Sequence, residues 1–77
     1  EVSTNKGRID AVIQTEDKIY IFEFKLYDTA QAALDQINDK AYYQQYLAAD
    51  KEIILVGVEF DQQDKNIGSY LTQVLAK

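Results

Sequence analysis

The stretch IYIFEFK, residues 19–25, decides the fold of this chain, because it reads as a β-strand that is apolar on both faces. β-Branched and aromatic residues, which favour strands, fill most of it. A strand of this kind is typical of the interior of a sheet that is covered on both sides. Glu23 and Lys25 stand out, because charged side chains are rarely buried without a partner. The stretch therefore predicts a central strand with a conspicuous pair of charges at its end.

A second strand is predicted for the preceding stretch GRIDAVI, residues 7–13, with a polar turn between the two strands. If Glu16 and Asp17 form a two-residue turn, Asp10 lies directly opposite Glu23 in an antiparallel hairpin. A three-residue loop would put these two carboxylates on opposite faces of the sheet, whereas a four-residue loop would keep them on one face with a shifted pairing. The register of the hairpin is therefore the first expectation to test.

In the two-residue register, Asp10, Glu23 and Lys25 share one face of the sheet, because opposite residues and residues two apart point the same way. Two carboxylates beside an ammonium group form the geometry of a divalent-metal site with a cationic helper. The alternative is that both carboxylates sit at the sheet edge in water, with Lys25 or Arg8 as partners in ion pairs worth little stability. The spacing alone leaves both interpretations open.

The rest of the chain predicts a helix followed by a buried strand. Residues 30–49 carry a small, alanine-rich apolar stripe at helical spacing, and Asp28 or Thr29 can cap the start of this helix. Residues 53–58, IILVGV, form a continuous apolar run that is typical of a buried parallel strand. Strand, helix and strand together indicate a right-handed crossover. Residues 67–75 are ambiguous, because their apolar spacing is helical while their length and flanks also suit an edge strand.

Composition limits the chemistry. The 77 residues suffice for one small domain, which we place at 1–77, and they contain no cysteine and no histidine. Any metal is then expected to bind oxygen ligands, which favours Mg²⁺, Mn²⁺ or Ca²⁺ over Zn²⁺. The formal net charge of −5 argues against a broad electrostatic surface for nucleic acid.

The sequence also bears on location. No apolar run approaches the roughly 18–20 residues that cross a bilayer, and no signal-peptide pattern is visible, so we expect no membrane partner. An acidic chain without cysteine fits the cytoplasm. The chain opens without methionine in the middle of a pattern, and we expect it to be one domain of a longer protein.

Together, these segments resemble the PD-(D/E)xK nuclease superfamily. The resemblance rests on residues 7–10, on the Glu-Phe-Lys of residues 23–25, and on a following helix that carries Gln36. The pattern of residues 33–46, followed by Val-Gly-Val at 56–58, looks like one branch of it. That branch is the C-terminal nuclease-like domain of bacterial AAA-ATPase-like proteins. The resemblance covers nearly the whole chain.

The resemblance implies an α/β fold, a truncated restriction-endonuclease-like core whose mixed sheet has an antiparallel hairpin, a crossover helix and a parallel strand. It favours a strand for residues 67–74. It implies that Asp10 and Glu23 hold Mg²⁺ or Mn²⁺, and that Lys25 stabilises developing charge or positions the attacking water. Gln36 would reach the site from the helix, so Asp10, Glu23, Lys25 and Gln36 are the expected catalytic residues.

The implied function is Mg²⁺-dependent hydrolysis of phosphodiester bonds in nucleic acid, with DNA as the expected substrate and an N-terminal ATPase-like region of the parent protein as a partner. The alternative is a catalytically inactive interaction or assembly module that keeps the nuclease fold. That alternative predicts a homo-oligomer in which copies share an apolar surface or an exposed strand edge. A helix and a strand that usually open the superfamily core are missing from these residues, so both functions stay open.

Overall fold

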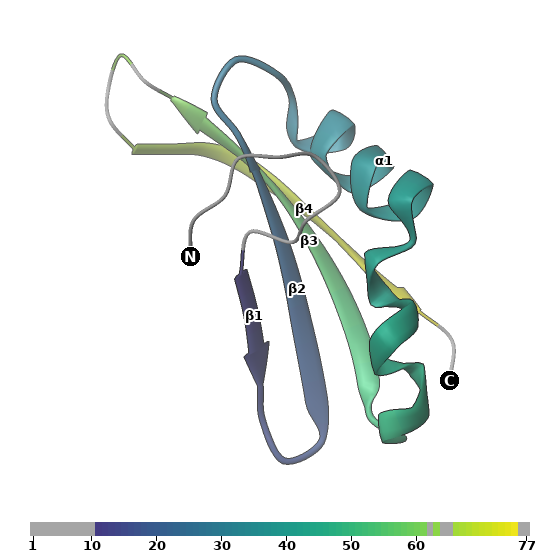
Figure 1. The fold of residues 1–77 in the computed structure, drawn as a ribbon. Helices are drawn as coiled ribbons and strands as arrows, with labels where there is room; N and C mark the ends of the chain where they lie inside the picture. Colours follow the sequence, from purple (N-terminus) through teal and green to yellow (C-terminus); the bar gives the residue numbers. More distant parts are fainter. Residues whose placement is uncertain (1–10, 62, 64–65, 76–77) are drawn as a thin grey trace.

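The predicted α/β architecture is confirmed by a computed structural model, which describes residues 11–61, 63 and 66–75. A four-stranded mixed sheet, ordered β1-β2-β3-β4, carries helical segments on one face (Figure 1). The strands pair antiparallel, parallel and antiparallel in that order. The elements are β1 (Ala11–Gln14), β2 (Lys18–Lys25), α1 (Ala30–Lys40), the 3-10 segment η1 (Tyr42–Ala49), β3 (Glu52–Asp61) and β4 (Asn66–Leu75).

The hairpin of β1 and β2 has the register expected for a two-residue turn. Ala11 pairs with Phe22, and the pairing continues without a shift to the turn. The Thr15 backbone N–H donates to the Lys18 carbonyl at 2.8 Å and closes this turn. The parity that the sequence predicts is therefore confirmed for the described part of the hairpin. Asp10 lies outside the described residues.

The start of α1 has the expected cap. Thr29 is the N-cap residue, with extended backbone, and its hydroxyl accepts the Ala32 N–H at 3.0 Å. Asp28, the other candidate, accepts the N–H of Thr29 instead, at 2.8 Å. The helix then crosses back over the sheet so that β3 lies parallel to β2, as predicted.

The predicted helix over residues 30–49 is wrong in its second half. The α-helix ends at Lys40, and Ala41 adopts a left-handed conformation with φ 54° and ψ 44°. Tight 3-10 turns follow, and within them Tyr43 and Tyr46 pack against the core. Partial burial of these two rings helps to offset the cost of left-handed backbone at a residue other than glycine.

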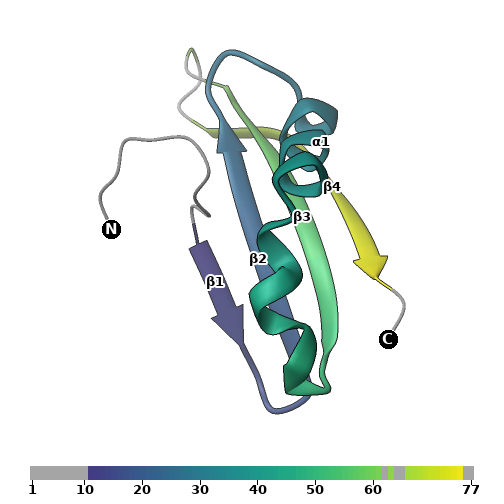
Figure 2. The ribbon, with the colours of Figure 1, turned by 45° about the vertical axis from the view of Figure 1, so that its right-hand side comes forward.

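Residues 67–75 form a strand, as the resemblance favours and against the helical spacing of their apolar residues. β4 pairs with β3 over its whole length, with one irregularity near Phe60. Backbone pairing with the central strand β3 outweighs the weak helical pattern, because tertiary context readily overrides local sequence preference. β4 lies at one edge of the sheet (Figure 2).

The core lies between α1 and the sheet. Gly57 permits this packing, because a Cβ atom there would lie 2.8 Å from the Leu34 backbone nitrogen. The sequence predicts cover on both faces of β2, but the described elements cover one face only (Figure 2). None of the described helices is long and apolar enough to span a bilayer. The central cluster is Ile19, Ile21, Leu34, Ile37, Ile53 and Leu55.

Candidate functional site

Glu23 is a buried carboxylate in the middle of the sheet. Strand alternation turns it to the same side of β2 as Ile21, which is the face that α1 covers. Its exposed fraction is only 5%. Its neighbour in β3 is Gly57, where the helix comes closest to the sheet. A carboxylate held at such a place needs polar partners, because its burial is otherwise costly.

Gln36 supplies one of these partners and links Glu23 to Lys25. The Gln36 Nε2 donates to the Glu23 Oε2 at 3.0 Å, and the Lys25 Nζ donates to the Gln36 Oε1 at 2.6 Å. The amide therefore uses its donor end for the carboxylate and its acceptor end for the ammonium group. The helix places Gln36 here because the adjacent Ile37 is anchored in the core. Three of the four predicted site residues thus form one hydrogen-bonded chain.

A shallow groove of about 470 Å³ runs along α1 beside this chain. Lys25 and Gln36 line it, and Lys40, one helical turn beyond Gln36, lines it too. Asp28, Asp35 and Asp39 also line the groove, so it has side chains of both charges. Through the groove, molecules in solution can reach Lys25 and Gln36, whose side chains contact one another next to Glu23.

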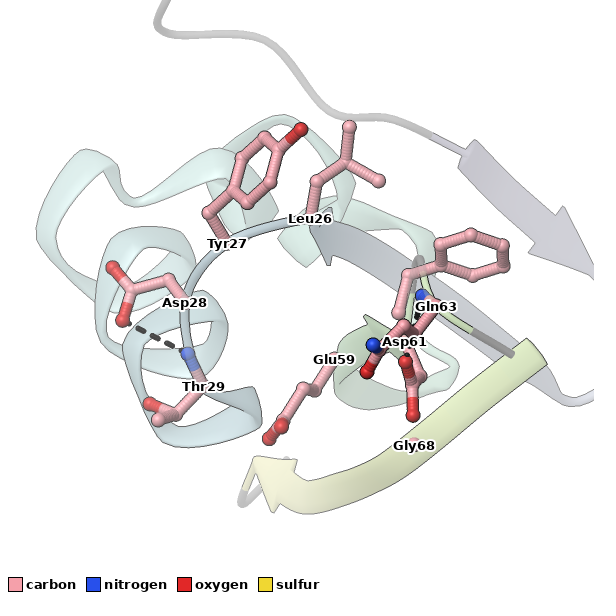
Figure 3. Close-up of a pocket in the computed structure, with 9 residues that line it drawn as sticks. Leu26, Tyr27, Asp28, Thr29, Glu59, Asp61, Gln63 and Gly68 are labelled. Carbon is pink, nitrogen blue, oxygen red and sulfur yellow. Dashed lines mark hydrogen bonds between the residues drawn. The ribbon is translucent and has the colours of Figure 1, made fainter. Parts of the chain in front are cut away.

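A larger hollow, of about 740 Å³, opens where the parallel strands β2 and β3 end (Figure 3). Its carboxylates stabilise the local backbone. Glu59 accepts the Ala30 N–H at 3.4 Å and the Ser69 hydroxyl at 3.2 Å, and Asp61 accepts the Gln63 N–H at 2.9 Å. The sequence gives no motif for this hollow, and only the rule that parallel strands end at a common edge points to it. Its acidic lining does not suit a polyanion.

The described residues test the predicted metal site in part. Within residues 11–61, 63 and 66–75, no group of three or more acidic, histidine or cysteine side chains gathers around one point. Glu23 provides a carboxylate, the hard oxygen donor that Mg²⁺ and Mn²⁺ prefer. The donor type therefore fits these ions, and the predicted second ligand, Asp10, lies outside the described part.

Comparison with known proteins agrees with the motifs. The sequence model of the PD-(D/E)XK nuclease superfamily matches residues 1–70. The chain is 35% identical, over 77 residues and 97% of its length, to an uncharacterized protein in the vnfD 5' region of Azotobacter chroococcum mcd 1. It spans 15% of the length of that relative. No solved structure gives a significant match.

Proposed function

The chain belongs to the PD-(D/E)XK nuclease superfamily, and on that premise we propose that it is a Mg²⁺-dependent nuclease domain that hydrolyses phosphodiester bonds of DNA. The observation that carries the proposal is the chain of hydrogen bonds from Lys25 through Gln36 to Glu23. In it, a single amide, that of Gln36, holds the ammonium group of Lys25 and the carboxylate of Glu23, which both come from β2. An exposed surface ion pair would need no such buried arrangement.

In this proposal Glu23 and Asp10 hold Mg²⁺ or Mn²⁺. The register supports the pairing, because Ala11 follows Asp10 in the chain and pairs with Phe22, the residue before Glu23. When bound, the ion polarises a phosphate and lowers the pKa of an attacking water. The burial of Glu23 keeps competing water away from its carboxylate and strengthens its attraction for a cation.

Lys25 is assigned to the charge that develops on the phosphate oxygens during cleavage. A lysine side chain has a long flexible stem, so its ammonium group needs a partner to hold it in place. The Gln36 carbonyl is that partner at 2.6 Å. Gln36 thus acts as a positioning residue, which fixes the ammonium group and one oxygen of Glu23 relative to each other.

The activity is proposed to belong to a longer cytoplasmic protein with an ATPase-like region N-terminal to this chain. The short span of the relative that this chain covers supports a longer parent. The net charge of −5 also supports it, because other regions are then needed to hold a polyanion.

The metal part of the proposal is tested by thermal unfolding. Mg²⁺ or Mn²⁺ at about 100 times its dissociation constant should stabilise the fold by roughly 2.7 kcal/mol, because it binds only the folded state. A melting temperature roughly 10–20 °C higher follows for a domain of this size. Glu23→Gln and Asp10→Asn should abolish the shift. Glu16→Gln, in the exposed turn, is the matched control and should keep it. An equal shift in all variants would place the ions elsewhere.

The catalytic part is tested on the longer protein. Lys25→Ala should leave the metal-induced shift in place and lower DNA cleavage by roughly 100-fold or more, the usual loss for a placed electrostatic stabiliser. Lys51→Ala, whose ammonium group donates to the Thr15 carbonyl far from the groove, is the control. A wild-type protein that binds Mg²⁺ and cuts neither DNA nor RNA would refute the nuclease assignment and favour the inactive assembly module.

A further inference from the structure

Among the described residues, β4 forms one edge of the sheet and has neither charged residues nor proline to protect it. It runs from Asn66 to Leu75, and all of its residues except Leu75 are exposed. None of its ten residues is charged, and none is proline. Edge strands of soluble proteins normally carry lysine, proline or a strong bulge, because an open row of backbone N–H and C=O groups pairs readily with another strand. Ten residues give an open edge about 33 Å long.

The irregularity of β4 lies at one end and leaves a regular segment. The register shift falls between Glu59 and Phe60, and beyond it the pairing with β3 is continuous from Ser69 to Leu75. The regular segment therefore offers an uninterrupted row of backbone groups on its free side, to which a further strand can pair. Its middle residue is Thr72.

We propose that β4 pairs antiparallel with β4 of a second copy of this chain, with Thr72 at the two-fold axis. Opposite residues of an antiparallel pair share a face, so an axis perpendicular to the sheet keeps every residue on its own side. The result is a continuous eight-stranded sheet with both α1 helices on one face. The apolar faces opposite the helices then join into one surface.

The side chains of β4 suit this self-pairing. Centring the axis on Thr72 places Tyr70 of each copy opposite Val74 of the other, which is a favourable aromatic and β-branched pair. These two side chains are 63% and 57% exposed in the single chain. Thr72 meets its own copy, and threonine pairs across strands form hydrogen bonds. Leu71 lies opposite Gln73, whose side-chain oxygen accepts a hydrogen bond from the Asn38 amide of α1 at 3.0 Å.

Charge favours a second copy as the occupant. The chain carries a net charge of −5, so two copies repel each other across most surfaces. At β4 the repulsion is reduced, because the strand itself is uncharged over its whole length. The pairing does not depend on catalysis, so it holds whether or not the nuclease proposal does.

A cysteine cross-link tests the register directly, because the chain has no cysteine of its own. Thr72→Cys should give a disulfide-linked dimer under mild oxidation, since the two Cβ atoms face each other across the axis. Gln14→Cys, on the exposed end of the opposite edge strand, is the matched control and should stay monomeric. Equal cross-linking of both variants would show random collision and overturn the proposal.

The oligomeric state in solution gives a second, independent test. Sedimentation of the 77-residue chain at high micromolar concentration should show a dimer, and Thr72→Lys should make it monomeric by placing like charges opposite each other. Gln14→Lys should leave the dimer intact, and circular dichroism checks that both variants fold. A monomeric wild type overturns the edge pairing. So does a dimer that is disrupted by Phe24→Lys, on the open sheet face, but not by Thr72→Lys. Failure of Thr72→Cys to cross-link in the longer parent protein, where another segment can cover the edge, would also overturn the pairing.

Discussion

The two faces of the sheet differ in what they bury. On the face covered by α1, Ile19, Ile21 and Leu55 are completely buried and Glu23 is nearly so. On the open face, Ile13 and Phe24 are 52% and 42% exposed, although Val56 and Val58 of β3 are buried there. The rings of Phe22 and Phe24 stack on this face with centroids 6.0 Å apart. Both faces are apolar in sequence, so hydrophobicity alone does not distinguish them. The packing of one short helix makes the difference.

This contrast explains where the candidate site lies. A buried carboxylate needs nearby donors that do not move, and α1 supplies one through Gln36. The open face has no such helix among the described residues, and its charges near the hairpin turn, Lys18 and Glu52, pair in water. The face covered by α1 can therefore position catalytic side chains, whereas the open face is suited to binding another protein surface.

The largest expected difference is between two isoleucines on opposite faces. Ile21→Ala removes a completely buried side chain and should lower the free energy of unfolding by about 2–5 kcal/mol. Ile13→Ala makes the same change on the open face, where Ile13 is 52% exposed, and should cost less than about 1 kcal/mol. Urea denaturation of both variants measures the difference. Equal losses would mean that the open face is covered in solution, as a close face-to-face association would require.

A second comparison tests how closely α1 must approach. Gly57→Ala places a Cβ atom against the backbone of α1, near the Ala30 carbonyl and the Leu34 nitrogen, and should destabilise the fold by about 1–3 kcal/mol. The new methyl group should also lift the helix and weaken the contact of Gln36 with Glu23. Gly68→Ala in β4 is the control, because its Cβ atom would lie 3.4 Å from the Glu59 carbonyl. Thermal unfolding with and without Mg²⁺ separates the two effects, and identical melting curves for both variants would contradict this role of Gly57.

Part of this contrast could be predicted from the sequence. The hairpin register is the one expected if Glu16 and Asp17 form a two-residue turn, and IILVGV reads plainly as a buried strand. The grouping of Glu23, Lys25 and Gln36 was implied by the resemblance. The hydrogen-bond partners were not predictable, because they depend on the height and rotation of α1 over Gly57.

Other features could not be predicted, for physical reasons. The break at Ala41 has no glycine or proline to mark it, since tertiary packing of Tyr43 and Tyr46 causes it. Among the described residues only one face of the sheet is covered, and this cannot be seen in a strand whose two faces are both apolar. Helical spacing in residues 67–75 pointed the wrong way, because alternation is weak in a strand whose residues are mostly exposed.

The cap of α1 offers a smaller perturbation of the covered face. Thr29→Ala removes the hydroxyl that accepts the Ala32 N–H and should cost about 1 kcal/mol of stability. Thr29→Ser should retain most of it, because serine caps equally well. Chemical denaturation of the two variants measures the cap. A Thr29→Ser variant as unstable as Thr29→Ala would show that the methyl group, and not the hydroxyl, stabilises the helix start.

The smallest effect is expected on the open face, at Lys18. A hydrogen bond to Glu52, at 3.3 Å, and the nearby charge of Asp17 raise the pKa of Lys18 above its ordinary value. A raised pKa means that the folded state binds the proton more tightly than the unfolded chain. The stability that protonated Lys18 contributes is therefore fully present below the unfolded pKa of roughly 10.4. It is lost as the pH rises through the higher pKa of the folded state.

Lys18→Gln should remove this contribution, so the stability difference between wild type and variant should shrink as the pH rises from about 9 to about 12. Because the pair is exposed to water, added salt should shrink the same difference at neutral pH. Lys40→Gln, at the exposed end of α1, controls for the general effect of alkali on the fold. Melting temperatures of the three proteins across this range provide the measurement. A stability difference between wild type and Lys18→Gln that grows with pH would contradict the raised pKa of Lys18. A difference that does not change with added salt would mean that the open face shields the Lys18–Glu52 pair from water.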